Sequence, residues 1–387
     1  MANHWPLRWP ILLGSLGPGA LGFLLPIYGK NIGASAFEIG GLFSVFAIVT
    51  LVCQPIVGWG VDRFGRKGFF VASFVGYAVA LAAFALANDV AGLFLGRVLQ
   101  GLASGLMWVS AYSISIDLAP ISERGRATGR VDETSSRGQL YGAAAGFALL
   151  LWFPLRSGWQ VLFIVYALLA AFGAALAVRQ TPQTTVYQPL PIERRRTASW
   201  PLLHLMIIVT LATLATSMAA PLLIVFLQDK FALGLFSLGL ALLPAALVFS
   251  FLPSRLGRVS DRFGRIPLMA IGYGAAGAIS PFLPSLSSLV WLIGLWTLAS
   301  LALVAAGPAQ SALVGDLGGG EVLGTRYGFY TSATGLGTTL GPALGGWLYD
   351  NVGWAAPFYL GGAVLMAIAL WITVPPNRRQ LTPRRGG

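Results

Sequence analysis

The chain has 387 residues, of which 56% are hydrophobic and only 10% are charged. This composition cannot cover the surface of a water-soluble protein, so it excludes soluble enzymes and soluble binding domains. The formal net charge of +12 would suit a nucleic-acid-binding protein, but the basic residues lie in short segments between apolar runs. That placement argues against nucleic acid as a partner.

Apolar runs recur along nearly the whole chain, and each is long enough to cross a hydrocarbon core about 30 Å thick. In chain order, we expect helices at Trp9–Tyr28, Phe37–Val61, Gly68–Ala87, Val90–Leu118, Thr128–Phe153, Gln160–Val178, Pro201–Phe226, Phe236–Gly257, Ile266–Pro284, Ser287–Val314, Tyr327–Leu348 and Pro357–Val374. The predicted fold class is an all-α membrane protein with twelve transmembrane helices.

Basic residues alternate between the loops of this pattern, as the two sides of a membrane protein require. Of the 25 Lys and Arg residues, only Lys30, Arg156 and Lys230 fall on one side, and Arg97 and Arg137 lie inside helices. All the others fall on the opposite side. Because loops rich in Lys and Arg face the cytoplasm, we predict a multi-pass protein of the cell membrane with both termini in the cytoplasm.

A polar interval divides the chain into two halves. It predicts a cytoplasmic linker at 181–199, between an N-terminal six-helix half at 1–180 and a C-terminal six-helix half at 200–387. The halves repeat one pattern, because residues 199 positions apart match, as Asp62 does with Asp261. Parallel repeats of this kind place a solute site near the membrane midplane, between the halves.

A short charged motif lies between the second and third expected helices and is repeated between the eighth and ninth. The first copy reads G-x-x-x-D-R-x-G-R-K, and the residues of the two copies are Gly58, Asp62, Arg63, Gly65 and Arg66, and Gly257, Asp261, Arg262, Gly264 and Arg265. The motif resembles the signature loop of the major facilitator superfamily. The resemblance implies a secondary active transporter that works by alternating access. It also implies that both copies, with Asp117 and Asp316, gate transport by latching one state.

Two further motifs are similar to those of the drug-efflux branch of that family. Arg97, Gln100 and Gly101 give R-x-x-Q-G, a motif whose arginine the family implicates in proton transfer. The string G-x-x-x-G-P-x-x-G-G begins at Gly337, on the eleventh expected helix, whereas drug/proton antiporters have it on the fifth. The motifs favour proton-coupled efflux, and the alternative is that the glycines form a close-packing seam.

Only two acidic residues fall away from the expected membrane surfaces, namely Asp132 and Glu133 in the fifth helix. Glu133 and Arg137 are one helical turn apart and can pair. Charges at this depth are costly in lipid, so we expect them to face a cavity. We hypothesise that Glu133 or Asp132 exchanges its proton for the substrate, and a static ion pair is the alternative.

Arg97 and Arg137 leave a second hypothesis open, because guanidinium groups suit carboxylates and phosphates. The chain could then be a carrier of organic anions or phosphorylated lipids, and a transport-inactive receptor or scaffold is a third possibility. Few charges beside many aromatic residues favour a hydrophobic or amphipathic solute. The residues expected to line its cavity are Tyr28, Trp108, Tyr112, Gln139, Tyr141, Gln310 and Tyr330. The expected partners are a small-molecule substrate, protons and the lipid bilayer, and we predict a monomer without metal, cofactor or catalytic residues.

Overall fold

The computed structural model describes residues 5–120, 123–183, 200–252, 262–316 and 323–373, together with residues 256 and 259. Its ordered elements are helices, and the described residues contain no strand. The all-α class predicted from the sequence is therefore confirmed. The chain forms two compact units, Met1–Pro191 and Ile192–Gly387, here called unit 1 and unit 2.

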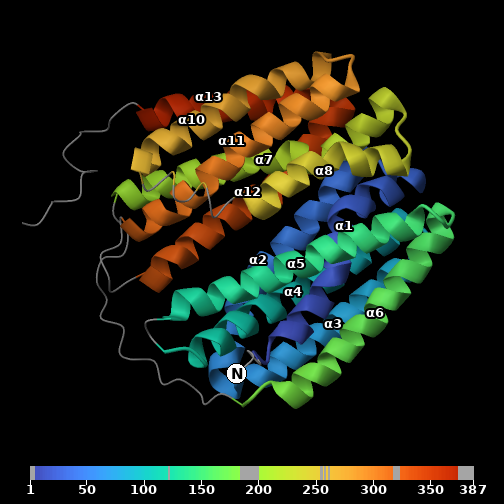
Figure 1. The fold of residues 1–387 in the computed structure, drawn as a ribbon, viewed down its shortest axis with the longest axis vertical. Coiled ribbons are helices and arrows are strands. Elements are labelled where there is room, and N and C mark those ends of the chain that lie inside the picture. Colours follow the sequence, from blue (N-terminus) through green and yellow to red (C-terminus); the bar gives the residue numbers. More distant parts are fainter. Residues whose placement is uncertain are drawn as a thin grey trace, which may run out of the picture. The chain divides into compact units, whose positions relative to one another are not determined.

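Unit 1 is built from long helices connected by short turns (Figure 1). Its helices are α1 (Arg8–Asn31), α2 (Ala36–Phe64), α3 (Arg66–Leu86), α4 (Val90–Asp117), α5 (Arg124–Leu150) and α6 (Leu155–Gln180). Within the unit, α1 packs against α5 and α6, α3 packs against α4 and α6, and α2 packs against α4.

Unit 2 repeats this arrangement. Its elements are α7 (Trp200–Phe231), α8 (Leu235–Phe251), α10 (Arg265–Ile279), the 3-10 helix η2 (Ser280–Ser285), α11 (Leu289–Asp316), α12 (Leu323–Asn351) and α13 (Ala356–Thr373). Here α7 packs against α12 and α13, α10 against α11 and α13, and α8 against α11. The expected helix Ile266–Pro284 is wrong in one respect, because the α-helix ends at Ile279 and continues as η2, which contains Pro281 and Pro284.

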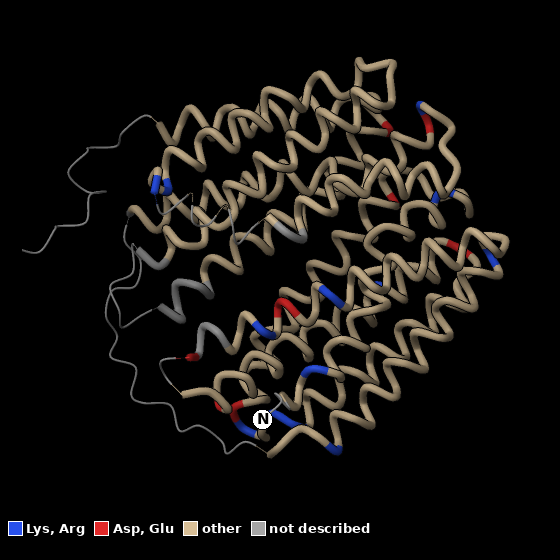
Figure 2. The backbone as a smooth tube through the Cα atoms, in the orientation of Figure 1, with Lys and Arg blue, Asp and Glu red and all other residues tan. Residues whose placement is uncertain are grey.

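Among the described residues, nine helices are long and apolar enough to cross a membrane, and α8 is a shorter apolar helix. The two long helices outside this set are α5 and α12, which are also counterparts in the repeat. Charged residues lie mostly near helix ends, but Figure 2 shows acidic and basic positions part-way along α5. The helix α5 is therefore the unusual element of unit 1.

Glycines allow α5 and α12 to approach their neighbours closely. A Cβ atom added at Gly142 of α5 would lie 1.9 Å from the carbonyl oxygen of Leu16 in α1. A Cβ atom at the counterpart, Gly341 of α12, would lie 2.1 Å from the hydroxyl of Ser217 in α7. The glycines of α5 and α12 thus form close-packing seams, against α1 and α7 respectively.

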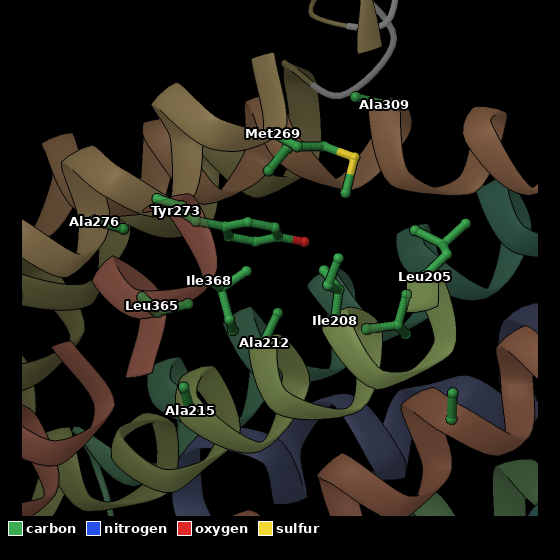
Figure 3. Packing of buried hydrophobic residues seen from close by; sticks show 14 of the residues in the cluster. Leu205, Ile208, Ala212, Ala215, Met269, Tyr273, Ala276, Ala309, Leu365 and Ile368 are labelled. Carbon is green, nitrogen blue, oxygen red and sulfur yellow. The ribbon is translucent and has the colours of Figure 1, made fainter. Parts of the chain in front are cut away.

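Large aromatic residues and small aliphatic residues fill the interior of the two units. In unit 1, Trp159 is fully buried and donates its indole N–H to the carbonyl oxygen of Phe84 at 2.7 Å. In unit 2, Tyr273 lies beside Met269 and Ile368 in a cluster that also includes Ile208 (Figure 3). This packing holds each unit together as a separate helical bundle.

Candidate functional site

The exposed side of α5 is polar over its N-terminal half. Exposed positions recur every three or four residues and so share one face of the helix. The chemically distinctive ones, here called the polar stripe, are Asp132, Glu133, Ser136, Arg137 and Tyr141. Beyond Tyr141 the same face continues as alanines.

Other helices of unit 1 expose faces of a different kind. On α3, Val75 is 51% exposed and Val79 is 52% exposed, and on α6 Leu168 and Phe172 are exposed. Large aliphatic and aromatic side chains of this kind suit contact with lipid. The charged side chains of the polar stripe begin about 12 Å along the axis of α5 from its first residue, Arg124. They do not suit contact with lipid, because a charge that faces hydrocarbon costs roughly 2.5–3.5 kcal/mol or more. We therefore expect the polar stripe to face an environment other than lipid.

Asp132 lies beside an aromatic pair on α4. Trp108 and Tyr112 are one turn apart, and their rings stack with centroids 5.5 Å apart and planes 26° apart. The hydroxyl of Tyr112 donates a hydrogen bond to the Oδ1 atom of Asp132. Three residues that the sequence singled out separately thus form one cluster, here called the Trp108 cluster.

Glu133 and Arg137 form an ion pair on the surface of α5, as their spacing predicted. Both side chains are more than half exposed. Exposed pairs of this spacing contribute little to stability, typically about 0.3–0.5 kcal/mol. Their chief effect here is that the two charges neutralise each other. The other carboxylate of the stripe, Asp132, has no basic partner among the described side chains.

Arg97 is enclosed within unit 1 and is only 3% exposed. Its guanidinium lies over the rings of Phe43 and Phe46 of α2, at 4.4 Å and 5.4 Å from their centroids. One nitrogen donates to the Oε1 atom of Gln100 at 2.9 Å, while Nε and Nη2 have no hydrogen-bond partner among the described residues. The expected proximity of Arg97 and Gln100 is present, but Arg97 and Arg137 are not brought together: they occupy different settings, one enclosed and one exposed.

The first copy of the charged motif forms an ion pair with Asp117, the residue that the family resemblance groups with it. Arg66 at the start of α3 is 4% exposed, and its Nε atom lies 2.9 Å from the Oδ2 atom of Asp117 at the end of α4. Gly65 has a φ of +89°, and its counterpart Gly264 has a φ of +90°, a backbone conformation that favours glycine. The motif therefore makes the same sharp turn in both units.

Other parts of the motif are less informative. A Cβ atom at Gly58 would meet no described atom within 4 Å, so close packing inside unit 1 does not require this glycine. Arg63 lies over the ring of Trp59, at 5.4 Å, and Asp62 has no resolved ion pair among the described residues. In the second copy, Arg262 is exposed and Arg265 begins α10. Three predicted gating positions lie outside what the structure describes, namely Gly257, Asp261 and the side chain of Asp316.

Several predicted cavity residues have structural roles. Tyr28 is 1% exposed, stacks on Trp159 with ring centroids 4.0 Å apart, and donates to the carbonyl oxygen of Ala87. Tyr28 therefore packs in the interior of unit 1, and its place in a solute cavity stays a prediction. Gln139 donates to the hydroxyl of Ser135 at 3.2 Å, and Tyr141 is 52% exposed on the polar stripe.

In unit 2, Gln310 joins two tyrosines. It is 7% exposed, accepts a hydrogen bond from the hydroxyl of Tyr273 and donates to the hydroxyl of Tyr330 at 3.2 Å. These residues come from α11, α10 and α12 respectively. The amide thus satisfies buried hydroxyl groups within the bundle, a packing role that places Gln310 inside unit 2.

The sequence matches the family model of the Major Facilitator Superfamily over residues 11–280 and 205–387. The chain belongs to this superfamily. It is 24% identical to multidrug resistance protein 1 of Bacillus subtilis (strain 168) over 370 residues, which cover 94% of this chain and 93% of that protein. It is 25% identical to the chromaffin granule amine transporter of Homo sapiens, over 89% of this chain and 66% of that protein.

Solved structures show the same fold. A bacterial homolog of the human lysosomal transporter Spinster, crystallised in an inward-facing and occupied conformation, superimposes with a TM-score of 0.76. The likeness covers 95% of this chain and 93% of that one, at 16% sequence identity. The protein is therefore a multi-pass membrane transporter of small molecules with the twelve-helix fold of its superfamily, and not an enzyme.

Two features of the site were not predicted from the sequence. One is the pair Phe43 and Phe46, which enclose the guanidinium of Arg97. The other is the contact of Trp108 and Tyr112 with Asp132, although the spacing of four residues places the two rings on one helix face. The first feature depends on how α2 packs against α4, which no spacing within α4 reveals.

Proposed function

We propose that this transporter exchanges protons for a hydrophobic or amphipathic solute, in the direction of efflux, with Asp132 as the coupling acid. The observation that supports this most strongly is the polar stripe of α5, in which Asp132 is exposed within unit 1 and lacks a basic partner among the described side chains. An acid at this position is able to bind a proton or a solute, and the two compete. The relative from Bacillus subtilis, named for multidrug resistance, supports efflux.

Asp132 suits the coupling role better than Glu133. Glu133 is already engaged in an ion pair with Arg137. Asp132 has only the hydroxyl of Tyr112 as a described partner. A hydroxyl can donate to the carboxylate, and it can also accept from the protonated acid, so Tyr112 is able to stay bonded in both states.

The proposed cycle is a simple exchange at one carboxylate. In the state open to the cytoplasm, the proton leaves Asp132 as the solute binds, and the solute is carried outward. In the opposite state, a proton from outside replaces the solute on Asp132, and the neutral acid allows the return step.

We further propose that one of these states is latched by the charged motif and its partners, namely Asp62, Arg66 and Asp117 in unit 1 and Asp261, Arg265 and Asp316 in unit 2. We also propose that both termini face the cytoplasm of a cell membrane.

The alternative is a carrier of organic anions or lipids that uses Arg97. Its supporting observation is the enclosed guanidinium, two of whose nitrogens have no hydrogen-bond partner among the described residues. An anion would satisfy them. Against this, Arg97 is 3% exposed, and Arg137 is already paired with Glu133.

Proton movement in proteoliposomes tests the proposal. A panel of lipophilic cations and organic anions is added to the wild type, to Asp132→Asn and to Glu133→Gln, which changes the net charge by the same amount. We expect a solute to drive proton movement through the wild type, Asp132→Asn to abolish it, and Glu133→Gln to retain it.

Two results would contradict this assignment. If transport runs without proton movement and is insensitive to Asp132→Asn, the coupling proposal is wrong. If transport is then specific for anions and is lost in Arg97→Gln, the anion carrier takes its place. A wild type that transports no solute of the panel while binding one would favour a receptor.

A further inference from the structure

We propose that the Trp108 cluster recognises organic monocations with aromatic or lipophilic bodies, and that Trp108 determines this specificity. The inference rests on the proposed use of Asp132 as the coupling acid, and it adds the charge and chemical class of the solute. Two physical attractions meet in the cluster, because an aromatic surface and a carboxylate both favour a cation.

The geometry of α4 supplies the aromatic surface. Trp108 and Tyr112 stack at 5.5 Å and 26°, so their rings form one continuous face along the helix. Each ring is half-buried, which leaves part of that face uncovered by unit 1. Trp has the aromatic side chain that attracts cations most strongly.

The carboxylate lies at the edge of this face. Tyr112 holds the Oδ1 atom of Asp132, and no described group bonds the Oδ2 atom. A cation lying on the Trp108 ring would therefore be close to a fixed negative charge without displacing a protein cation from it. If Asp132 were paired with a Lys or Arg side chain, that ion pair would have to break before a solute cation could bind. No such pair involves Asp132 among the described side chains.

The surroundings disfavour an anion at this position. The exposed basic group of the stripe, Arg137, is neutralised by Glu133. The enclosed basic group, Arg97, lies eleven residues before Trp108 on the same helix, about 16 Å along its axis. An anion on the Trp108 ring would be repelled by the negative face of the ring and by the carboxylate of Asp132.

The internal repeat indicates that the cluster is not part of the common scaffold. The positions of unit 2 that correspond to Trp108, Tyr112 and Asp132 are Gly307, Ser311 and Thr331. Unit 2 keeps the glycine seam and the charged-motif turn without these three side chains. Packing of the bundle therefore does not require the cluster, which favours a role in recognition.

Equilibrium binding of two probes of the same shape and opposite charge tests the inference. Tetraphenylphosphonium and tetraphenylborate are measured by dialysis against the full-length protein in nanodiscs, with no proton gradient. We expect the wild type to bind the phosphonium, Trp108→Leu to weaken it about 3–30-fold, and Trp108→Phe to stay within about threefold of the wild type. Tetraphenylborate binding should change less than about threefold in every variant. Trp152→Leu, at an 85% exposed tryptophan beyond the end of α5, is the control and should behave as the wild type.

The outcomes separate this inference from the coupling proposal. Phosphonium binding that depends on Trp108, with no proton movement in proteoliposomes, keeps the recognition site and removes the coupling role of Asp132. Proton coupling through Asp132, with equal binding of both probes or with no effect of Trp108→Leu, overturns the recognition site alone. Absence of phosphonium binding to the wild type also overturns it, and a matching loss in Trp152→Leu would assign the effect to general destabilisation.

Discussion

The helices α5 and α12 occupy equivalent places in the two repeats, yet they expose different chemistry. Both pack through glycines, with Gly142 against α1 and Gly341 against α7. On the exposed side, α5 presents the polar stripe, while α12 presents Leu336, Leu340 and Leu344. The buried faces have kept one pattern, and the exposed faces have diverged.

This difference separates the scaffold from the specialised site. A close helix seam tolerates only the smallest residues, so both repeats retain it. An exposed face is not constrained by packing within its unit, and it is free to acquire charge where transport requires it. Unit 1 therefore contains the chemistry that we assign to coupling and recognition, whereas unit 2 offers neutral groups such as the Gln310 network.

Replacing Asp132 by the residue at its counterpart should have the largest effect. We expect Asp132→Thr to lower proton-driven transport by at least about 100-fold, because loss of the only coupling acid removes the exchange step. Transport of a fluorescent cation into inverted vesicles measures this.

Moving the acid to unit 2 sharpens the comparison. In the double variant Asp132→Thr/Thr331→Asp, the carboxylate returns at the equivalent position, but Gly307 and Ser311 stand where unit 1 has the aromatic pair. We expect transport to remain lost. Recovery to within about threefold would mean that the two units are interchangeable and that the Trp108 cluster is unnecessary.

Breaking the Arg66–Asp117 pair should have the next largest effect, and this effect is on stability. Arg66 belongs to the charged motif, which both repeats contain. Asp117→Asn removes the negative charge 2.9 Å from the Nε atom of Arg66, whose side chain is 4% exposed, and we expect it to lower the free energy of unfolding by about 2–3 kcal/mol. Thermal unfolding in detergent measures the loss.

The counterpart variant Asp316→Asn asks whether the second copy of the motif behaves in the same way. A similar loss would support a latch in both units, and a loss in Asp117→Asn alone would confine it to unit 1. No loss in Asp117→Asn would mean that the ion pair is not a stabilising contact.

The glycine seams should respond equally in the two units. Adding one methyl group in Gly142→Ala or Gly341→Ala places a Cβ atom about 2 Å from atoms of the facing helix, so the helices must separate. We expect each variant to lower stability by about 1–2 kcal/mol. Gly58→Ala, which meets no described atom within 4 Å, is the matched control in the same thermal unfolding experiment. A much smaller effect in one seam would contradict the shared packing.

Much of the fold could be predicted from the sequence, because its determinants are local. Each membrane helix is an apolar run of the required length, and the repeat is visible as matching residues at a fixed offset. The pairing of Arg66 with Asp117 was also predictable, since the turn fixed by Gly65 brings the starts and ends of neighbouring helices together. Among the described residues, two helices end clearly short of the expectation: α10 ends at Ile279 and continues as η2, and α8 ends at Phe251 instead of Gly257.

The site was less predictable, because its residues meet across helices. Tyr28 and Trp108 are both aromatic residues in apolar helices, yet Tyr28 is enclosed against Trp159 while Trp108 stays half-buried beside Asp132. Composition and spacing do not distinguish them. The distinction depends on which helix packs against each side chain, and that information is in the tertiary structure.

The smallest effect is expected from the ion pair of the polar stripe. The double variant Glu133→Ser/Arg137→Leu installs the residues that α12 has at the equivalent positions, and it removes both charges together. Because both side chains are more than half exposed, their pairing contributes about 0.3–0.5 kcal/mol, and the melting temperature should fall by no more than about two degrees. Proton-driven transport should stay within about threefold of the wild type, since Asp132 and its aromatic pair are untouched. A loss as large as that in Asp132→Thr would instead show that the whole charged stripe, and not one carboxylate, distinguishes α5 from α12.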